Sequence, residues 1–144
     1  MLSQTTEYAL RAIVYLAEHH GEAQTGEQIG VVTKVPIGYL AKIMQGLVKS
    51  GLVASQRGLH GGFTLLRSPK DITILDIVQV VDPIVRITSC PLHLPNHGSD
   101  LCPLHRRLDN AMGAVETAFG RTTVAQLLAD PHGSKPLCNF PRNS

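Results

Sequence analysis

Apolar residues near the N-terminus recur with the period of an α-helix. They predict an amphipathic helix over about residues 4–19, and Gly21 follows as a stop signal. Thr25 and Gln28 have the spacing of a capping box, in which each side chain bonds to the other residue's backbone N–H. This pattern predicts a second, shorter helix that reaches about Val32.

The next residues predict a third helix after a tight turn. Pro36 suits the first turn of this helix, and Gly51 suits its C-terminal cap. Because only residues 33–35 separate the second and third helices, the pair is predicted to be a helix-turn-helix. The third helix carries one apolar stripe, formed by Ile37, Leu40, Ile43, Met44, Leu47 and Val48.

The pattern then changes from helical spacing to short extended runs. Residues 52–55 and 63–66 are strand candidates, and the glycine-rich turn 56–62 between them carries Arg57. A helix-turn-helix followed at once by a β-hairpin predicts a winged helix-turn-helix. A plain β-hairpin that caps a small helical domain is the alternative that these residues leave open.

The second half of the chain predicts helices on either side of an irregular segment. Thr73 and Asp76 cap a helix that ends at Asp82 and Pro83. Residues 84–101 have no periodicity and predict a loop.

A long helix is predicted from about Pro103, and it carries an apolar seam with coiled-coil spacing. A seam of this length favours contact with a second subunit over contact with the domain's own core. Gly120 is expected to end this helix, and Thr123 to cap a last short one. The seam positions are Leu104, Leu108, Ala111, Val115 and Ala118.

Charge is distributed unevenly along the chain, although the formal net charge is only +2. Residues 24–70 hold six Lys and Arg side chains against Glu27 alone, a surplus of +5, whereas residues 71–144 carry −1. A local basic surplus beside a near-neutral remainder is typical of a face that binds nucleic acid. The alternative is a solvated basic face without a ligand. With no Trp and 4% aromatic residues, a stacking platform for single strands is not expected.

The start of the third helix is the predicted reading head, because the second helix of a helix-turn-helix enters the major groove with its N-terminal residues. Gly38 would let the backbone approach the DNA closely, and Lys42 faces outward one turn later. Tyr39 could donate to a phosphate or pack under Leu40, and both interpretations stay open.

The hairpin turn is the predicted wing. Its glycines would let the tip enter a narrow minor groove with Arg57 or His60. Lys49 and Arg57 would flank the major groove and contact phosphates rather than read sequence. The predicted DNA-binding residues are Gly38, Tyr39, Lys42, Lys49, Arg57, His60 and Gly61.

Two copies of the tetrapeptide Cys-Pro-Leu-His stand twelve residues apart, at 90–93 and 102–105. Thiolate and imidazole ligands suit zinc and iron-sulfur centres. Cys102 also begins a predicted helix, whose dipole favours the thiolate. The alternative is a pair of buried, inert cysteines with surface histidines. Three cysteines, an odd number, do not predict a disulfide framework, and Cys138 is expected to be a bystander.

The chain resembles the Rrf-type transcriptional regulators, and five motifs in the same order and spacing carry the resemblance. They are Thr-Glu-Tyr-Ala-Leu-Arg at 6–11, Pro-Ile-Gly-Tyr-Leu-Ala-Lys at 36–42, Gly-Leu-Val-Ala-Ser at 51–55, Arg-Gly-Leu-His-Gly-Gly at 57–62 and Ile-Thr-Ile-Leu-Asp at 72–76. The resemblance implies a dimeric winged-helix protein that binds operator DNA, with a dimerisation helix at 103–119. Many such proteins carry a 2Fe-2S or 4Fe-4S cluster in the loop before that helix.

The family's ligand pattern matches this chain in part. Cys90 and Cys102 correspond to the outer two of three usual cysteines, and His105 to a histidine ligand that follows them. The middle cysteine is missing from the stretch 94–98, which favours 2Fe-2S over 4Fe-4S. Glu7 stands where some members supply an acidic ligand from the partner subunit, although it could also be a plain solvent-facing carboxylate. The implied ligands are Cys90, Cys102, His105 and Glu7, with His93 or His97 as substitutes.

Three functions are therefore open. The first is a repressor that senses redox state, nitric oxide or iron-sulfur status through a cluster. The second is a cluster-free regulator of the same fold that responds through thiol chemistry or a partner protein. The third is a zinc-stabilised interaction module that does not read DNA.

Other classes are not expected. No convergent acid-base pair is evident, and a nucleophile formed by Cys102 and His105 would lack an oxyanion site, so the chain is not predicted to be an enzyme. No apolar run is long enough for a transmembrane helix, and the N-terminus lacks the regions of a signal peptide.

A cytoplasmic homodimer is expected, with four parts: a DNA-binding domain at 1–83, a cysteine and histidine loop at 84–102, dimerisation and closing helices at 103–130, and a flexible tail at 131–144. The fold class is mainly α (α+β), a winged helix-turn-helix with a long C-terminal dimerisation helix.

Overall fold

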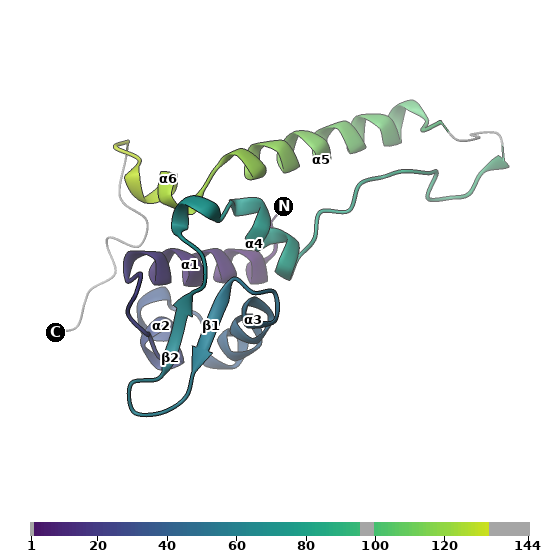
Figure 1. Cartoon of the computed structure of the whole chain (residues 1–144). Coiled ribbons are helices and arrows are strands. Elements are labelled where there is room, and N and C mark those ends of the chain that lie inside the picture. The colour runs from purple at the N-terminus through teal and green to yellow at the C-terminus, as the bar shows by residue number, and fades with distance from the viewer. Residues whose placement is uncertain (1, 96–99, 133–144) are drawn as a thin grey trace.

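Most elements of the protein pack around the first helix, and one long helix leaves this body as an arm (Figure 1). The computed structural model describes residues 2–95 and 100–132. The elements in chain order are α1 (Gln4–Glu18), α2 (Gly26–Thr33), α3 (Ile37–Lys49), β1 (Val53–Gln56), β2 (Gly62–Leu65), the short 3-10 helix η1 (Pro69–Asp71), α4 (Ile74–Val81), α5 (Pro103–Arg121) and α6 (Val124–Ala129).

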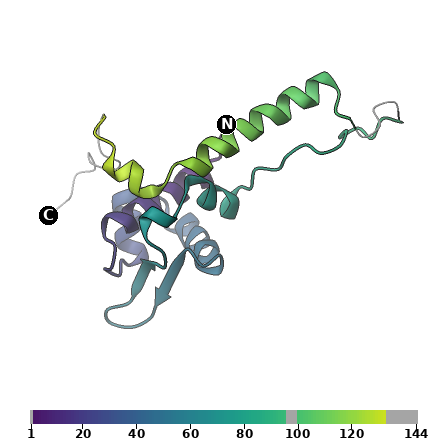
Figure 2. The ribbon, with the colours of Figure 1, turned by 45° about the horizontal axis from the view of Figure 1, so that its top comes forward.

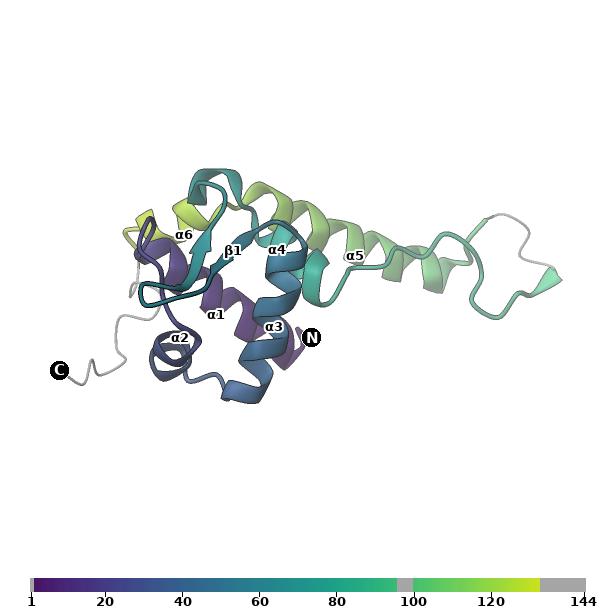
Figure 3. The same cartoon turned by 60° about the horizontal axis from the view of Figure 1, so that its bottom comes forward.

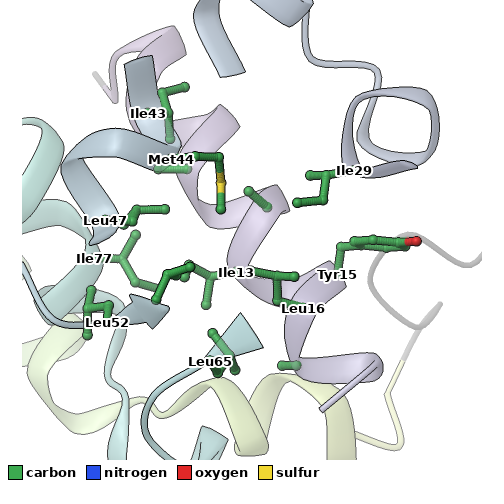
Figure 4. Packing of buried hydrophobic residues seen from close by; sticks show 14 of the residues in the cluster. Ile13, Tyr15, Leu16, Ile29, Ile43, Met44, Leu47, Leu52, Leu65 and Ile77 are labelled. Carbon is green, nitrogen blue, oxygen red and sulfur yellow. The ribbon is translucent and has the colours of Figure 1, made fainter. Parts of the chain in front are cut away.

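The core is centred on α1, which contacts α2, α3, α4, α6 and β2. Ala9 and Ala12 on this helix are completely buried, so neighbouring elements approach its backbone closely. Figure 4 shows branched side chains from several elements converging, among them Ile13 of α1, Leu47 of α3 and Ile77 of α4. Each such residue contributes about 1.5–3 kcal/mol through burial.

The predicted helix-turn-helix forms as α2 and α3. The Thr25 hydroxyl accepts from Gln28 N at 3.1 Å while Thr25 N donates to Gln28 Oε1 at 2.9 Å, which confirms the capping box. Lys34 ends α2 in the left-handed region, with φ +56°, and turns the chain toward α3. Pro36 is not in the first turn of α3 as predicted but precedes it, because its ψ of 136° is extended rather than helical.

The predicted hairpin also forms, and with α2 and α3 it makes a winged helix-turn-helix. β1 and β2 pair antiparallel, with Val53 opposite Leu65 and Gln56 opposite Gly62. The strands are shifted by one residue from their predicted bounds, because pairing across the hairpin starts at Gly62. We call β1, β2 and the turn 57–61 between them the wing.

The chain returns from the arm to the body at the end of α5. Ile74 N donates to Thr122 O at 3.0 Å and Val124 N donates to Ile72 O at 2.8 Å, so the start of α4 is joined to the link between α5 and α6. Gly120 does not end α5, which continues to Arg121. A Cβ at position 120 would lie 3.4 Å from the Leu75 side chain. Glycine at this position within α5 therefore leaves room for α4 to lie close by.

The segment between α4 and α5 contains neither helix nor strand within 84–94 and 100–101, as predicted for a loop, and Pro95 is in 3-10 conformation. Figures 1 and 2 show that it runs outward beside α5 and that the chain then returns along the helix. We call residues 84–90 the strap, and we call the strap, the loop after it and α5 together the arm. Of the predicted tail at 131–144, residues 133–144 lie outside the described residues.

Candidate DNA interface and metal ligands

The predicted reading head lies on a face of the body that carries α2, α3 and the wing. Figure 3 brings this face forward, with the arm extending to one side. The apolar stripe of α3 is buried at Leu40, Ile43, Met44 and Leu47, so the opposite side of the helix faces solvent. Lys42 and Lys49 are exposed there.

The first turn of α3 is open to a ligand. A Cβ at Gly38 would meet no atom within 4 Å, so packing inside the protein does not require glycine at this position. The Tyr39 ring lies edge-on to Tyr8 of α1, with 6.1 Å between ring centroids, and the residue remains 56% exposed. Of the two interpretations of Tyr39, packing under Leu40 is therefore replaced by contact with Tyr8, which the sequence pattern did not indicate.

The wing presents a narrow, exposed tip. Arg57 and His60 are exposed, and Gly61 N donates to Gly58 O at 3.0 Å to close the turn. A Cβ at Gly61 would lie 2.5 Å from Gln56 O, so glycine at 61 has a packing reason within the hairpin.

A buried glutamine joins the wing to the core. Gln24 N donates to Phe63 O at 3.0 Å, and Phe63 N donates to Gln24 O at 2.7 Å. The Tyr15 hydroxyl of α1 donates to Gln24 Oε1 at 2.8 Å. These contacts orient the wing relative to α1. Sequence reasoning missed them, since a lone polar residue before a capping box carries no signal for a distant strand.

On the arm, two of the predicted metal ligands lie together. Cys102 is the N-cap residue of α5, and its Sγ lies 3.2 Å from His105 Nδ1, one helical turn later. Cys90 is buried, with 6% of its surface exposed, and its carbonyl accepts from His93 N at 3.0 Å. Both cysteines are free thiols.

The other predicted ligands do not join this pair in one chain. Within residues 2–95 and 100–132, no three His, Cys, Asp or Glu side chains converge as a metal site would require. His97 lies outside the described residues. The thiol and imidazole chemistry suits zinc or an iron-sulfur centre, but a single chain assembles only Cys102 and His105.

Glu7 lies on α1 and is engaged by an arginine. Arg11 Nε donates to Glu7 Oε1 at 3.1 Å, and Arg11 Nη1 donates to Thr33 O at 3.3 Å, at the end of α2. The guanidinium also lies over the Tyr8 ring, 5.6 Å from its centroid. The carboxylate is thus linked through Arg11 to the turn of the helix-turn-helix and, through Tyr8, to the reading helix.

An ion pair that the sequence did not indicate joins the strap to α5. Arg86 Nε and Nη2 donate to the two carboxylate oxygens of Asp109 at 2.7 and 2.8 Å. Ile87 N donates to Asp109 Oδ1 at 2.9 Å. The hydrogen bonds from Arg86 hold the pKa of Asp109 below its ordinary value, and the same pairing raises the pKa of Arg86.

The predicted dimer seam is exposed on the arm except at Val115, which is half-buried. Leu104 and Leu108 are 62% and 48% exposed, and α5 contains no buried residue. Met112, which the predicted seam omits, is 37% exposed on the same helix. Among the described residues, no helix is long and apolar enough to cross a membrane.

Comparison with known proteins identifies the relatives of this chain. The Rrf2 family, described as iron-dependent transcriptional regulators, matches residues 2–130. A protein of Aquifex aeolicus named as an HTH-type transcriptional regulator is 33% identical over 132 residues, which cover 89% of this chain and 91% of the relative. The HTH-type transcriptional regulator NsrR of Halalkalibacterium halodurans is 26% identical, with 90% of this chain and 88% of NsrR covered.

Solved structures show the same fold. IscR of T. potens superposes with a TM-score of 0.75 at 26% identity, covering 90% of this chain and 87% of that one. CymR (YrzC) of B. subtilis, described as a global cysteine regulator, superposes with a TM-score of 0.73 at 28% identity, covering 90% and 96%. These relatives are regulators of transcription and not enzymes. The chain therefore belongs to the Rrf2 family of transcriptional regulators.

Proposed function

We propose that this chain is a dimeric repressor that reads operator DNA with α3 and the wing, and whose DNA affinity depends on an iron-sulfur cofactor held in the arm. The observation that carries the proposal is the pairing of an exposed basic reading face with the Cys102–His105 pair at the start of α5. The family description as iron-dependent regulators supports the same assignment.

The DNA face combines two kinds of contact. The open first turn of α3 suits base edges in the major groove, and Lys42 follows one turn later. Lys49 and Arg57 flank this helix as phosphate contacts, while Arg57 or His60 on the wing suits the adjacent minor groove. The buried Gln24 contacts hold the wing to α1, the helix against which α3 also packs, and docking in two grooves at once requires such a fixed arrangement.

Two substitutions separate reading of sequence from binding of phosphate. We expect Lys42→Ala to change the preference among operator variants by about 1–3 kcal/mol if Lys42 reaches a base edge. We expect Arg57→Ala to weaken binding to all sequences and to lower the salt-dependence slope by about one. Fluorescence anisotropy with labelled duplexes over a series of salt concentrations measures both quantities.

The control for these variants is Lys70→Ala, because Lys70 is exposed on η1, which packs against α6. Lys70→Ala also removes one positive charge, and it should leave both the preference among operator variants and the salt-dependence slope nearly unchanged. If neither Lys42→Ala nor Arg57→Ala alters binding to a genuine operator, the DNA face lies elsewhere.

The cofactor site is proposed to need both subunits. Cys90, Cys102 and His105 would supply ligands from one arm, and Glu7 of the partner subunit would supply the fourth, with His93 or His97 as substitutes. Two cysteines in the loop favour 2Fe-2S over 4Fe-4S, and zinc is the alternative occupant. When bound, an iron-sulfur cofactor supplies a centre that is sensitive to redox state and nitric oxide.

The contacts of Glu7 suggest how the arm could influence the reading head. Arg11 holds Glu7 on one side and the carbonyl of Thr33 on the other. A Glu7 carboxylate that turns toward a cofactor would release Arg11 from this bridge, which lies beside the turn between α2 and α3. Half-sites about 34 Å apart tolerate little change in the separation of the two reading helices. A small movement of the turn between α2 and α3 would therefore change operator affinity.

Substitution of the arm ligands tests the cofactor directly. We expect Cys102→Ala to abolish bound iron and visible colour, and Glu7→Gln to leave a cofactor that is less stable or spectrally altered. Anaerobic absorption spectra with iron and sulfide analysis measure this, and Cys138→Ala serves as the control that should change nothing. We expect the cofactor to shift operator affinity by about 1–3 kcal/mol. Equal affinity of apo and loaded protein for one operator would contradict the sensing role even if the cofactor is present.

A second candidate function is a cluster-free regulator that responds through thiol chemistry. The Cys102–His105 contact at 3.2 Å favours it, because it places an imidazole nitrogen beside a free thiol at the start of α5. The similarity to CymR, a global cysteine regulator, points the same way. Anaerobically purified protein without iron, whose operator affinity changes on thiol oxidation, would select this candidate over the first.

A further inference from the structure

We propose that the Arg86–Asp109 ion pair is a register clamp that sets Cys90 level with Cys102 along α5. This inference rests on the proposed function, in which Cys90, Cys102 and His105 bind one cofactor. It adds two positioning residues, neither of which is a ligand.

The clamp has a defined geometry. The Arg86 guanidinium and the Asp109 carboxylate meet through two parallel hydrogen bonds of 2.7 and 2.8 Å, and the backbone N–H of Ile87 adds a third contact of 2.9 Å. A bidentate pair of this kind fixes orientation as well as distance. A Cβ at Gly113 would lie 2.9 Å from the guanidinium, so the arginine occupies space on α5 that the glycine leaves open.

The clamp matters because the strap runs antiparallel to α5. Figures 1 and 2 show the chain leaving the body beside the helix and returning along it. A fixed contact between two antiparallel segments determines which residue of one segment lies opposite which residue of the other. Sliding the strap by one residue would move Cys90 by about 3.3 Å along the helix.

The chain lengths from the clamp to the two cysteines place both on the outer part of the arm. Cys102 lies seven residues before Asp109 on α5, which is about 10 Å along the helix axis. Cys90 lies three residues beyond Ile87 on the strap, which bends at Ser89, so this stretch spans at most about 10 Å. Both lie on the same side of the clamp, toward the start of α5. The clamp therefore confines Cys90 to the outer part of the arm, which also carries Cys102 and His105.

The burial of Cys90 agrees with this placement. Its surface is 6% exposed, although the residues on either side of it in the loop, Ser89 and Pro91, are exposed. A thiol held at one position on the arm is consistent with a strap that is anchored a few residues earlier. Without the anchor, the chain from the end of α4 to Cys102 would be a long loop, and Cys90 could lie at many heights.

Metal binding by the apo protein tests the clamp. Full-length protein is titrated with Co²⁺ in the absence of air and DNA, and the thiolate-to-Co²⁺ absorption band gives the affinity. We expect Asp109→Asn and Arg86→Gln to weaken Co²⁺ binding by about 10–100-fold, as loss of a ligand-orienting contact commonly does. Arg107→Gln, which removes an exposed guanidinium from the same helix, is the matched control and should bind as the wild type does.

Arg86→Lys keeps the positive charge but cannot form the two parallel bonds, so it tests the clamp even if Arg86→Gln does not fold. We expect the Co²⁺ affinity of Arg86→Lys to lie between the affinities of the wild type and Asp109→Asn. Unchanged Co²⁺ affinity in folded Asp109→Asn and folded Arg86→Lys would overturn the proposal.

A second readout does not need metal. In a Cys138→Ser background, a maleimide labels the remaining thiols, and mass spectrometry follows the rate at Cys90, which is buried. We expect this rate to be several-fold faster in the clamp variants, because release of the strap exposes the thiol, and equal rates would overturn the clamp. If wild-type protein binds no Co²⁺, the metal part of the proposed function fails, and labelling of Cys90 alone decides the clamp. If the clamp variants lose metal but metal does not alter DNA binding, the clamp stands and the proposed regulation fails.

Discussion

Leu108→Asp is expected to convert the protein into a monomer that binds its operator at least about 100-fold more weakly, because joining two half-site contacts commonly gains that much. Leu108 is 48% exposed and lies between Leu104 and Met112, which are also exposed on α5. An isolated helix with this surface would leave a leucine stripe in water, whereas a second subunit would cover it. A carboxylate in that contact would have to be buried without a partner.

The reason for the large effect on DNA binding is geometric. Two reading helices about 34 Å apart can contact both half-sites only if the subunits are joined. Sedimentation analysis measures the subunit state, and anisotropy measures operator affinity. The control is Leu66→Asp, which places the same charge on an exposed leucine beside the wing and should leave the subunit state unchanged. A wild-type monomer at micromolar concentration, or a Leu108→Asp dimer, would contradict the prediction.

Gly62→Ala is expected to lower the free energy of unfolding by about 2–4 kcal/mol, from backbone strain together with loss of hydrogen bonds at the wing. Gly62 has φ +144°, which side-chain-bearing residues rarely adopt. A Cβ there would lie 2.6 Å from the carbonyl carbon and oxygen of Gln24. Because those atoms belong to the backbone pair between Gln24 and Phe63, relief of the clash separates the wing from the core.

Urea denaturation measures this change, and Gly38→Ala is the matched control. Position 38 lies in a helix with open space around it, so alanine there should leave stability unchanged or raise it by up to about 1 kcal/mol. In the same preparations, Gly62→Ala should bind operator DNA more weakly at temperatures where it remains folded, since the wing has lost its orientation. An unaltered unfolding midpoint would show that the wing does not need glycine at this position.

Local patterns in the sequence were enough to predict the helices and, except at Pro36 before α3, their N-terminal ends. Thr25 with Gln28 begins α2 and Thr73 with Asp76 begins α4, and in each case the hydrogen bonds join residues three positions apart. Such contacts form whatever the rest of the chain does. Four positions of the apolar stripe predicted for α3 are buried, whereas Ile37 at its start is 67% exposed and Val48 is half-buried. The order of helices and hairpin then implied the winged fold.

Contacts between distant residues were decided only by the tertiary structure. Gly120 lies within α5 and faces Leu75 of α4, and the wing is held by Gln24 and Tyr15 of the core. The pair between Arg86 and Asp109 joins positions 23 residues apart, on a loop and a helix that give no periodic signal for each other. The sequence by itself determined which elements form and which side chains carry thiol, imidazole and positive charge. Only the folded chain decided which of these groups lie together, because the distances between elements depend on how all of them pack around α1.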